Sequence, residues 1–176
     1  MKLNIGCGAA KMAGFVNVDL YGDPDVRLDL ESFPWPWPDN SVDEVVAIHV
    51  MEHLGRTPDG FVGVMKELWR VCRHGAIVHI AVPHPRHDNF ISDPTHRTPI
   101  TPLLLQLFSR RLNLEWRRVG AANSALALHH GVEGGRQLVE IGIGHLVPVD
   151  LSEENVFTQL QCASSTSKSL AFINLQ

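Results

Sequence analysis

Residues 2–20 read KLNIGCGAAKMAGFVNVDL, and this stretch decides the fold class. An apolar run over residues 2–5 meets Gly6 and Gly8. A second apolar run ends in Asp19, eleven residues after Gly8. Glycines directly after a strand let a ligand approach the backbone closely. The stretch therefore predicts a strand, a ligand-binding turn and a second strand.

Dinucleotides and nucleoside triphosphates fit this turn poorly. The dinucleotide fingerprint needs a third glycine and a full helix before the acidic residue. Lys11 stands where the third glycine belongs, and residues 11–14 leave room for little more than one helical turn. A Walker loop is excluded, because no Gly-Lys-Ser or Gly-Lys-Thr follows.

S-adenosylmethionine fits the turn better. Backbone N–H groups at the glycines can receive its carboxylate. Asp19 is placed to accept hydrogen bonds from its ribose hydroxyls, and Asp29 and Leu30, after a third apolar run, are placed to border its adenine. These features follow strands, and open α/β sheets bind ligands at the carboxyl ends of their strands.

The next stretches predict alternating strands and helices. Residues 42–48 and 76–82 are apolar runs typical of buried strands. Between them, residues 59–72 have helical periodicity, with Asp59 as N-cap and Gly75 beyond the end. Strand, helix and strand in this order indicate parallel crossovers and an α/β sheet.

The second half gives weaker signals. Residues 83–102 have no periodicity and predict a functional loop. We expect a helix over residues 102–111, a strand over 114–119 and a last strand over 169–175. Residues 124–129 are compatible with a helix, and residues 137–143 with a strand.

Five motifs occur in order along residues 2–100: LNIGCG, FVNVDL, RLDL, FPWPWPDNSVDEVVAIHVMEHL and ELWRVCRHGAIVHIAVPH. Together they resemble class I S-adenosylmethionine-dependent methyltransferases, most closely the small methyltransferase type 11-like domains. The resemblance implies a Rossmann-like α/β fold. Its sheet would have seven mostly parallel strands, helices on both faces and an antiparallel C-terminal strand. We expect one domain over residues 1–176, with a cofactor-binding half (1–83) and a substrate-side half (84–176).

The predicted cofactor is S-adenosylmethionine, with S-adenosylhomocysteine as product. The residues predicted to bind it lie in the glycine turn and at strand ends. They are Asn4, Gly6, Cys7, Gly8, Asp19, Leu20, Asp29, Leu30 and His49. We interpret Cys7 as a small packing residue rather than a nucleophile.

Methyl transfer from a sulfonium is an in-line displacement, so the protein mainly aligns the reactants and excludes water. A hydroxyl or ammonium acceptor must also lose a proton, and histidine suits that role. The predicted catalytic residues are His84 and His49, with His87 or Asp88 behind them. Glu52 is expected to brace the loop that follows the fourth strand.

The loop after residue 83 also carries Asp93 and His96, so a metal site is an alternative. Its spacing matches no standard zinc pattern. We therefore predict that residues 84–96 form the acceptor side of the pocket and hold no metal. Two other functions remain open: a metal-dependent hydrolase that uses the His84–His96 loop, and a non-catalytic cofactor-binding or assembly domain.

Composition bears on the partners. The formal net charge of −4 and pI near 6.2 disfavour nucleic-acid and anionic-membrane binding. HVME stands where DNA amino-methylating enzymes carry an Asn/Asp-Pro-Pro-Tyr/Phe motif. We therefore expect a small-molecule acceptor, such as a sugar or a biosynthetic intermediate. The three scattered cysteines and the lack of a signal-peptide pattern predict a cytoplasmic protein. The oligomeric state is left open.

Overall fold

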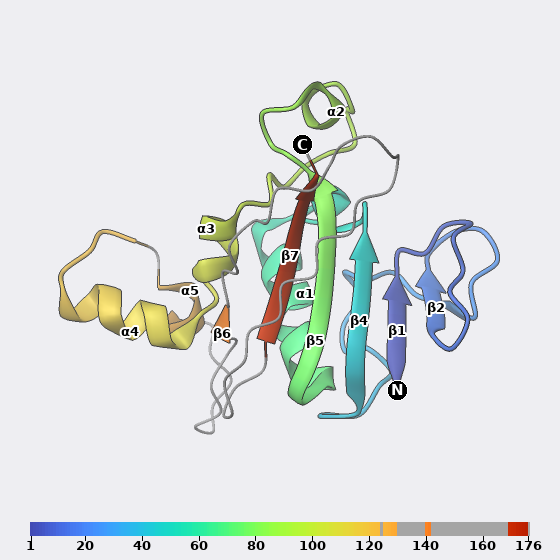
Figure 1. Ribbon diagram of the computed structural model, residues 1–176, viewed down its shortest axis with the longest axis horizontal. Helices are drawn as coiled ribbons and strands as arrows, with labels where there is room; N and C mark the ends of the chain where they lie inside the picture. The colour runs from blue at the N-terminus through green and yellow to red at the C-terminus, as the bar shows by residue number, and fades with distance from the viewer. Residues whose placement is uncertain (124, 130–139, 142–168, 176) are drawn as a thin grey trace, which may run out of the picture.

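The computed structural model describes residues 1–123, 125–129, 140–141 and 169–175. These residues form a seven-stranded sheet in the order β3-β2-β1-β4-β5-β7-β6 (Figure 1). The strands are β1 (Lys2–Ile5), β2 (Val16–Asp19), β3 (Val26–Arg27), β4 (Val42–Ile48), β5 (Cys72–Pro83), β6 (Glu140–Ile141) and β7 (Ser169–Leu175). The helices are the 3-10 turn η1 (Met51–His53), α1 (Pro58–Val71), α2 (Asp88–Ile91), α3 (Pro102–Gln106), α4 (Arg110–Arg118) and α5 (Leu126–His129).

The central strands form because their apolar side chains are buried by the sheet and by α1. Leu3 in β1 pairs with Val45 in β4, and Val45 pairs with Val78 in β5; all three are at most 2% exposed. Every pair of neighbouring strands in the described sheet runs parallel. The predicted Rossmann-like, mostly parallel α/β fold is confirmed.

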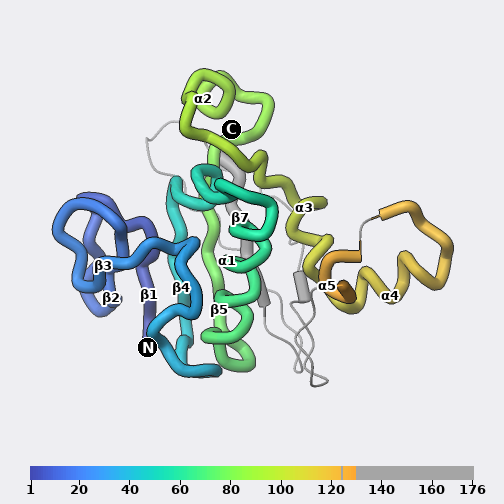
Figure 2. The backbone as a smooth tube through the Cα atoms, turned by 180° about the vertical axis from the view of Figure 1, so that it is seen from behind, coloured from blue at the N-terminus to red at the C-terminus, as the bar shows by residue number. Residues whose placement is uncertain are grey.

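Helix α1 covers one face of the central strands (Figure 2). Its N-cap is Thr57, whose Oγ1 accepts a hydrogen bond from the Gly60 N–H at 3.1 Å. Asp59, the predicted cap, lies inside the first turn instead, because Pro58 already occupies the first helical position. The apolar residues that α1 buries are Phe61, Val64, Met65, Leu68, Trp69 and Val71.

The helices among the described residues lie on one face of the central strands (Figures 1 and 2), whereas the sequence predicts helices on both faces. Phe108, after α3, packs against Phe61 of α1 with ring centroids 6.1 Å apart, so these helices share one face. The described residues place no helix on the other face of β4 and β5 (Figures 1 and 2). The links from β1 to β2 and from β2 to β3 are too short to hold a crossover helix.

The C-terminal strand also differs from the prediction. β7 lies between β5 and β6 and pairs parallel with both, whereas the resemblance implied an antiparallel strand. A parallel neighbour needs a long connection, and the chain between β6 and β7 supplies one. The alternation of residues 169–175 predicts a strand but carries no information on its direction.

Two element boundaries need correction. β5 starts at Cys72, directly after α1, and Gly75 lies within the strand rather than after the helix. Its φ of +78° falls in the irregularity between the pairs Val42–Cys72 and Glu44–Ile77. The strand predicted over residues 114–119 is helix α4, which begins after its N-cap Ser109. No helix among the described residues is long and apolar enough to cross a membrane.

Candidate active site

The glycine turn joins β1 to β2 at the carboxyl end of the sheet. The Cys7 N–H donates to the Val18 carbonyl at 3.1 Å, and the Gly8 N–H donates to Asp19 Oδ2 at 2.8 Å. Gly6 and Gly8 both have left-handed backbone, with φ of +63° and +51°. A Cβ on Gly6 would overlap Val50, whereas a Cβ on Gly8 would meet nothing within 4 Å. Protein packing therefore explains Gly6, while Gly8 faces open space that a ligand can use.

Asp19 ends β2 beside this open space. Its Oδ1 accepts from the Tyr21 N–H at 2.9 Å, and its Oδ2 accepts from Gly8. Each carboxylate oxygen has a further lone pair, so Asp19 can still accept hydrogen bonds from two hydroxyls. Leu20, 37% exposed, follows it. This turn and carboxylate fit a ligand that carries an anionic end and a diol.

Asn4 and Cys7 lie beneath the turn rather than on its surface. The Asn4 amide donates to the Ala10 carbonyl and to Asn17 Oδ1, both at 2.9 Å. Cys7 is 5% exposed, and burial, reinforced by the nearby Asp19 carboxylate, raises the pKa of its thiol. Both residues support the turn, as expected for a packing cysteine.

Asp29 is already engaged by a cation that the sequence did not reveal. Arg56 Nη2 lies 2.8 and 2.7 Å from the two Asp29 oxygens, and Arg56 Nε pairs with Glu31. Burial alone would raise the pKa of both carboxyls. The lowering effect is larger: Asp29 accepts a hydrogen bond from the Glu31 N–H, Glu31 accepts one from the Gly55 N–H, and the Arg56 guanidinium binds both. The pKa of each carboxyl therefore lies below its ordinary value. Leu30, the other residue predicted beside the adenine, is 6% exposed and belongs to the core.

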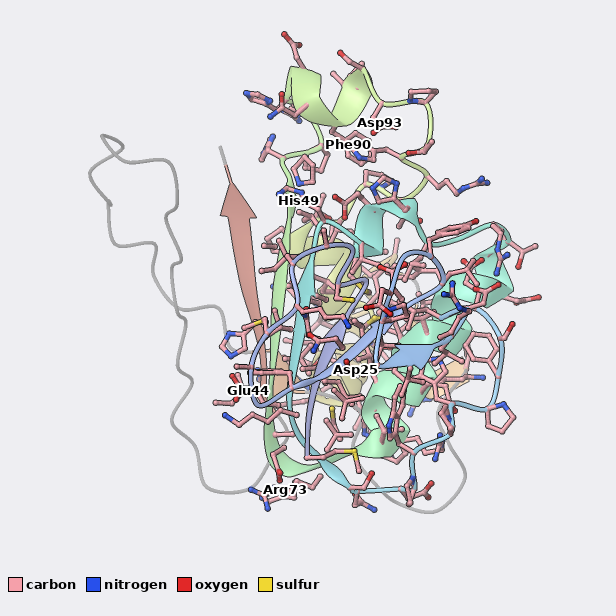
Figure 3. The ribbon with its side chains drawn as sticks, turned by 90° about the vertical axis from the view of Figure 1, so that its right-hand side faces the viewer. Asp25, Glu44, His49, Arg73, Phe90 and Asp93 are labelled. Carbon is pink, nitrogen blue, oxygen red and sulfur yellow. The ribbon has the colours of Figure 1, made fainter. Side chains whose placement is uncertain are left out.

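His49 follows β4 with an unusual backbone. Its φ is +52°, and its N–H donates to the Ala81 carbonyl in β5 at 2.8 Å. Its Nδ1 lies 3.3 Å from Oε1 of the fully buried Glu52, while the ring remains about half exposed. Figure 3 shows His49 at the end of the sheet beneath the loop that carries Phe90 and Asp93. A buried carboxylate therefore orients an accessible imidazole, in agreement with the bracing role expected of Glu52.

The other predicted catalytic residues lie in the loop above β5 and hold its backbone. His84 Nδ1 accepts from the Arg86 N–H at 3.2 Å, and His87 Nδ1 accepts from the Asn89 N–H at 3.1 Å. Asp88 is exposed in the single turn of α2. The strand register, in which Ile48 pairs with Ala81, brings His84 near the level of His49.

A surface hollow of about 510 Å³ lies elsewhere, along the first half of α1. It is lined by Glu31, Phe33, Thr57, Asp59, Gly60, Val62, Gly63, Lys66 and Glu67. None of the residues predicted to bind a cofactor or to act in catalysis lines it. We place the candidate site at the strand ends instead, because parallel sheets bind ligands there.

Two comparisons with known proteins gave matches. Residues 17–80 match the family described as Methyltransferase domain. A solved structure, a SAM-dependent methyltransferase from Archaeoglobus fulgidus, aligns with a TM-score of 0.50 and 26% sequence identity. The alignment covers 60% of this chain and 56% of that chain, so this chain spans little more than half of that structure's length. A search of curated proteins gave no match.

Proposed function

We propose that this chain is a class I S-adenosylmethionine-dependent methyltransferase that methylates a small-molecule acceptor; the family match over residues 17–80 and the structural likeness support the proposal. The observation that carries the proposal is the alignment of three neighbouring strand ends. β2 ends in Asp19, β1 leads into the open Gly8 turn, and β4 leads into His49. The cofactor's diol, its anionic end and its methyl group need groups of this kind in this order.

S-adenosylmethionine, the donor that this family uses, supplies a methyl group on a positively charged sulfur. The Gly8 turn lets the donor approach the backbone, since a side chain there would fill the open space. Asp19 accepts from the ribose hydroxyls, and Leu20 offers an apolar surface beside them. We retain Asp29 at the adenine end, where its pairing with Arg56 fixes the carboxylate rather than leaving it free to move.

His49 is the best placed of the four predicted catalytic residues. Its Nδ1 faces the Glu52 carboxylate, so Nδ1 carries the hydrogen and Nε2 keeps a lone pair. That lone pair can take the proton of an acceptor hydroxyl or ammonium as the methyl group arrives. His84 and His87 use their Nδ1 lone pairs on loop backbone, so we assign them, with Asp88, to the wall around the acceptor.

A small acceptor suits the charge of the chain. The net charge of −4 disfavours a general attraction to the phosphates of a nucleic acid. The segment after β4 offers histidines and a glutamate rather than a motif that grips the amine of a base.

Calorimetry with S-adenosylhomocysteine tests the cofactor assignment. We expect binding by the wild type and a loss of about 1.5–3 kcal/mol for Asp19→Ala, because charge-assisted hydrogen bonds are worth that much. Asp23→Ala is the matched control, since Asp23 is fully exposed and pairs only at the surface with Lys11. Equal affinities of wild type and Asp19→Ala, with both folded, would remove Asp19 from the site.

Turnover tests the base. With radiolabelled S-adenosylmethionine and a panel of sugars and small hydroxylated compounds, an acceptor is identified by methyl incorporation. His49→Ala should then lower turnover by about 10²–10⁴-fold while the affinity for S-adenosylhomocysteine stays within twofold, the range typical of general bases. His74→Ala removes an exposed histidine at the far end of β5 and serves as control. Full turnover by His49→Ala would assign the proton to another group.

A further inference from the structure

We propose that Glu52, His53 and His96 form a binding site for one divalent transition-metal ion. One ligand atom from each side chain lies within 4.8 Å of the others. Methyl transfer does not require this site, and the proposal does not rest on the donor assignment.

The three residues come from two segments that the backbone ties together. Glu52 and His53 belong to η1, and His96 belongs to the loop after α2. The N–H groups of Arg97 and Thr98 both donate to the Glu52 carbonyl, at 2.8 and 3.1 Å. The cluster is therefore held in place without a ligand, as a preformed site requires.

Glu52 gives the first sign that a cation is needed. Its side chain is fully buried, and one oxygen, Oε1, faces His49. The other, Oε2, has no hydrogen-bond partner among the described residues. A buried carboxylate oxygen without a partner is strongly disfavoured, and a bound cation is one of the few groups that satisfy it.

The histidines give a second sign, because their partners fix which ring nitrogen carries hydrogen. His96 Nδ1 lies 2.9 Å from the Phe90 carbonyl, which only accepts, so Nδ1 donates and Nε2 keeps a lone pair. That Nε2 lies 3.7 Å from Asp93 Oδ2. Nε2 faces that carboxylate either as the N–H of a protonated ring, or as the lone pair of a neutral ring with a cation between them.

The same logic applies to His53. The Thr95 hydroxyl donates to Asp93 Oδ1 at 2.6 Å, so at 3.0 Å it accepts from His53 Nδ1. His53 Nε2 is then the nitrogen with a lone pair. Metal-bound histidines usually donate their other ring N–H to an oxygen in this way, which fixes the ring and its tautomer.

The donor set suits zinc or ferrous iron. Two imidazole nitrogens and one carboxylate oxygen bind Zn²⁺ in catalytic sites and Fe²⁺ in facial triads, and both arrangements leave a coordination position open. The ligands must close on a metal about 2.0–2.2 Å from each of them.

The proposal replaces the expectation that the His84–His96 loop holds no metal. That expectation rested on the spacing within the loop, and His84 and His87 do bind loop backbone instead. Two of the three ligands come from η1, a segment 43 residues before His96 as counted from His53. Spacing within the loop cannot reveal them.

The test uses the full chain and metal alone. After treatment with a chelator and its removal, the protein is titrated with Co²⁺, whose visible absorption reports the ligands, and then with Zn²⁺. We expect one Co²⁺ per chain, displaced by Zn²⁺, and affinities at least ~100-fold weaker for His96→Ala and Glu52→Gln. His87→Asn is the matched control, because it removes a histidine of the same loop but keeps an N-cap acceptor for α2.

Two outcomes overturn the proposal. A folded wild type that binds no stoichiometric Co²⁺ would show that Glu52 and the histidines form a protonated network. Binding that is unchanged in His96→Ala, or lost equally in His87→Asn, would place the metal elsewhere. If Glu52→Gln does not fold, the less buried His53→Ala replaces it. The experiment does not measure S-adenosylhomocysteine binding, so its result neither supports nor contradicts the cofactor assignment.

Discussion

Gly6 and Gly8 share one backbone conformation but lie in different surroundings. Both have positive φ, so an alanine at either position costs ~1–2 kcal/mol of left-handed strain. Gly6→Ala must also push Val50 aside, which adds about 1–3 kcal/mol of overpacking. We expect Gly6→Ala to lower the free energy of unfolding by that further amount relative to Gly8→Ala, as measured by urea unfolding.

The same pair separates packing from binding. Gly8→Val should retain the fold and lose S-adenosylhomocysteine, since its side chain occupies the open space and no protein atom opposes it. Normal binding by Gly8→Val would mean that the turn is only structural.

Single residues show how far the sequence alone could go. The positions of Gly8, Asp19 and His49 at strand ends follow from the buried apolar runs before them. Their contacts do not, because Arg56 reaches Asp29 across 27 residues. Glu52, likewise, is braced against His49 as expected, but its carboxylate also lies in a cluster with His96 from a distant loop.

At the scale of elements, Arg56 joins the segment before α1 to the loop after β3. The stability that this junction contributes should depend on pH. The pKa values of Asp29 and Glu31 are depressed, so their stabilisation is full above the unfolded values of about 3.9 and 4.3 and is lost as pH falls through the folded values. Arg56→Met removes the guanidinium. We expect the variant to be less stable than wild type at pH 7, and the difference to shrink near pH 3.

Urea midpoints at the two pH values provide the measurement. Arg27→Met is the control, since the Arg27 guanidinium donates to the carbonyls of Leu20 and Gly22, which do not titrate. A difference between Arg56→Met and wild type that is equal at pH 7 and pH 3 would contradict the ion-pair explanation.

The α-helical cluster beyond α3 depends on one buried amide. Asn113 of α4 is fully buried, and its Oδ1 accepts from the Ala127 N–H of α5 at 3.0 Å. The same N–H also donates to the Leu107 carbonyl at 3.1 Å, so Asn113→Ala removes one of its two acceptors and should cost about 0.5–1.5 kcal/mol of unfolding free energy. Leu114→Ala, at a 39% exposed position of the same helix, should cost much less. Similar thermal midpoints for the two variants would show that the amide does not join the helices.

Elements were predictable where the apolar pattern of the sequence is clear. β1, β4 and β7 have the predicted bounds, because continuous or alternating apolar runs indicate strands directly. α4 was mistaken for a strand because Leu114, Trp116 and Val119 seemed strand-like, while its helical signals are the Ser109 cap and the Glu115–Arg118 pair, 2.7 Å apart. Tertiary packing around Asn113 determines that this segment is a helix, and the periodicity of the sequence does not reveal that packing.

At the scale of the whole molecule, the cofactor site should stabilise the entire sheet. The proposed site spans the turn after β1 and the end of β2, so S-adenosylhomocysteine bound there at 100 times its dissociation constant should add about 2.7 kcal/mol to the free energy of unfolding. We expect a single thermal transition that moves upward with ligand in wild type. Asp19→Ala should show a much smaller upward movement at the same ligand concentration, and an equal one would argue against a site at Asp19.

The position of β7 has a consequence for how the chain acquires its structure. β5 pairs with β7 across about ninety residues, from Ile77 to Ser169, and β6 joins the described sheet only through β7. Pairings this distant in sequence form slowly, because the intervening loop must close first. During biosynthesis the edge of β5 stays open until the last strand leaves the ribosome. An open edge recruits other strands, so nascent chains stalled before residue 169 should be the species most prone to aggregate and most dependent on chaperones.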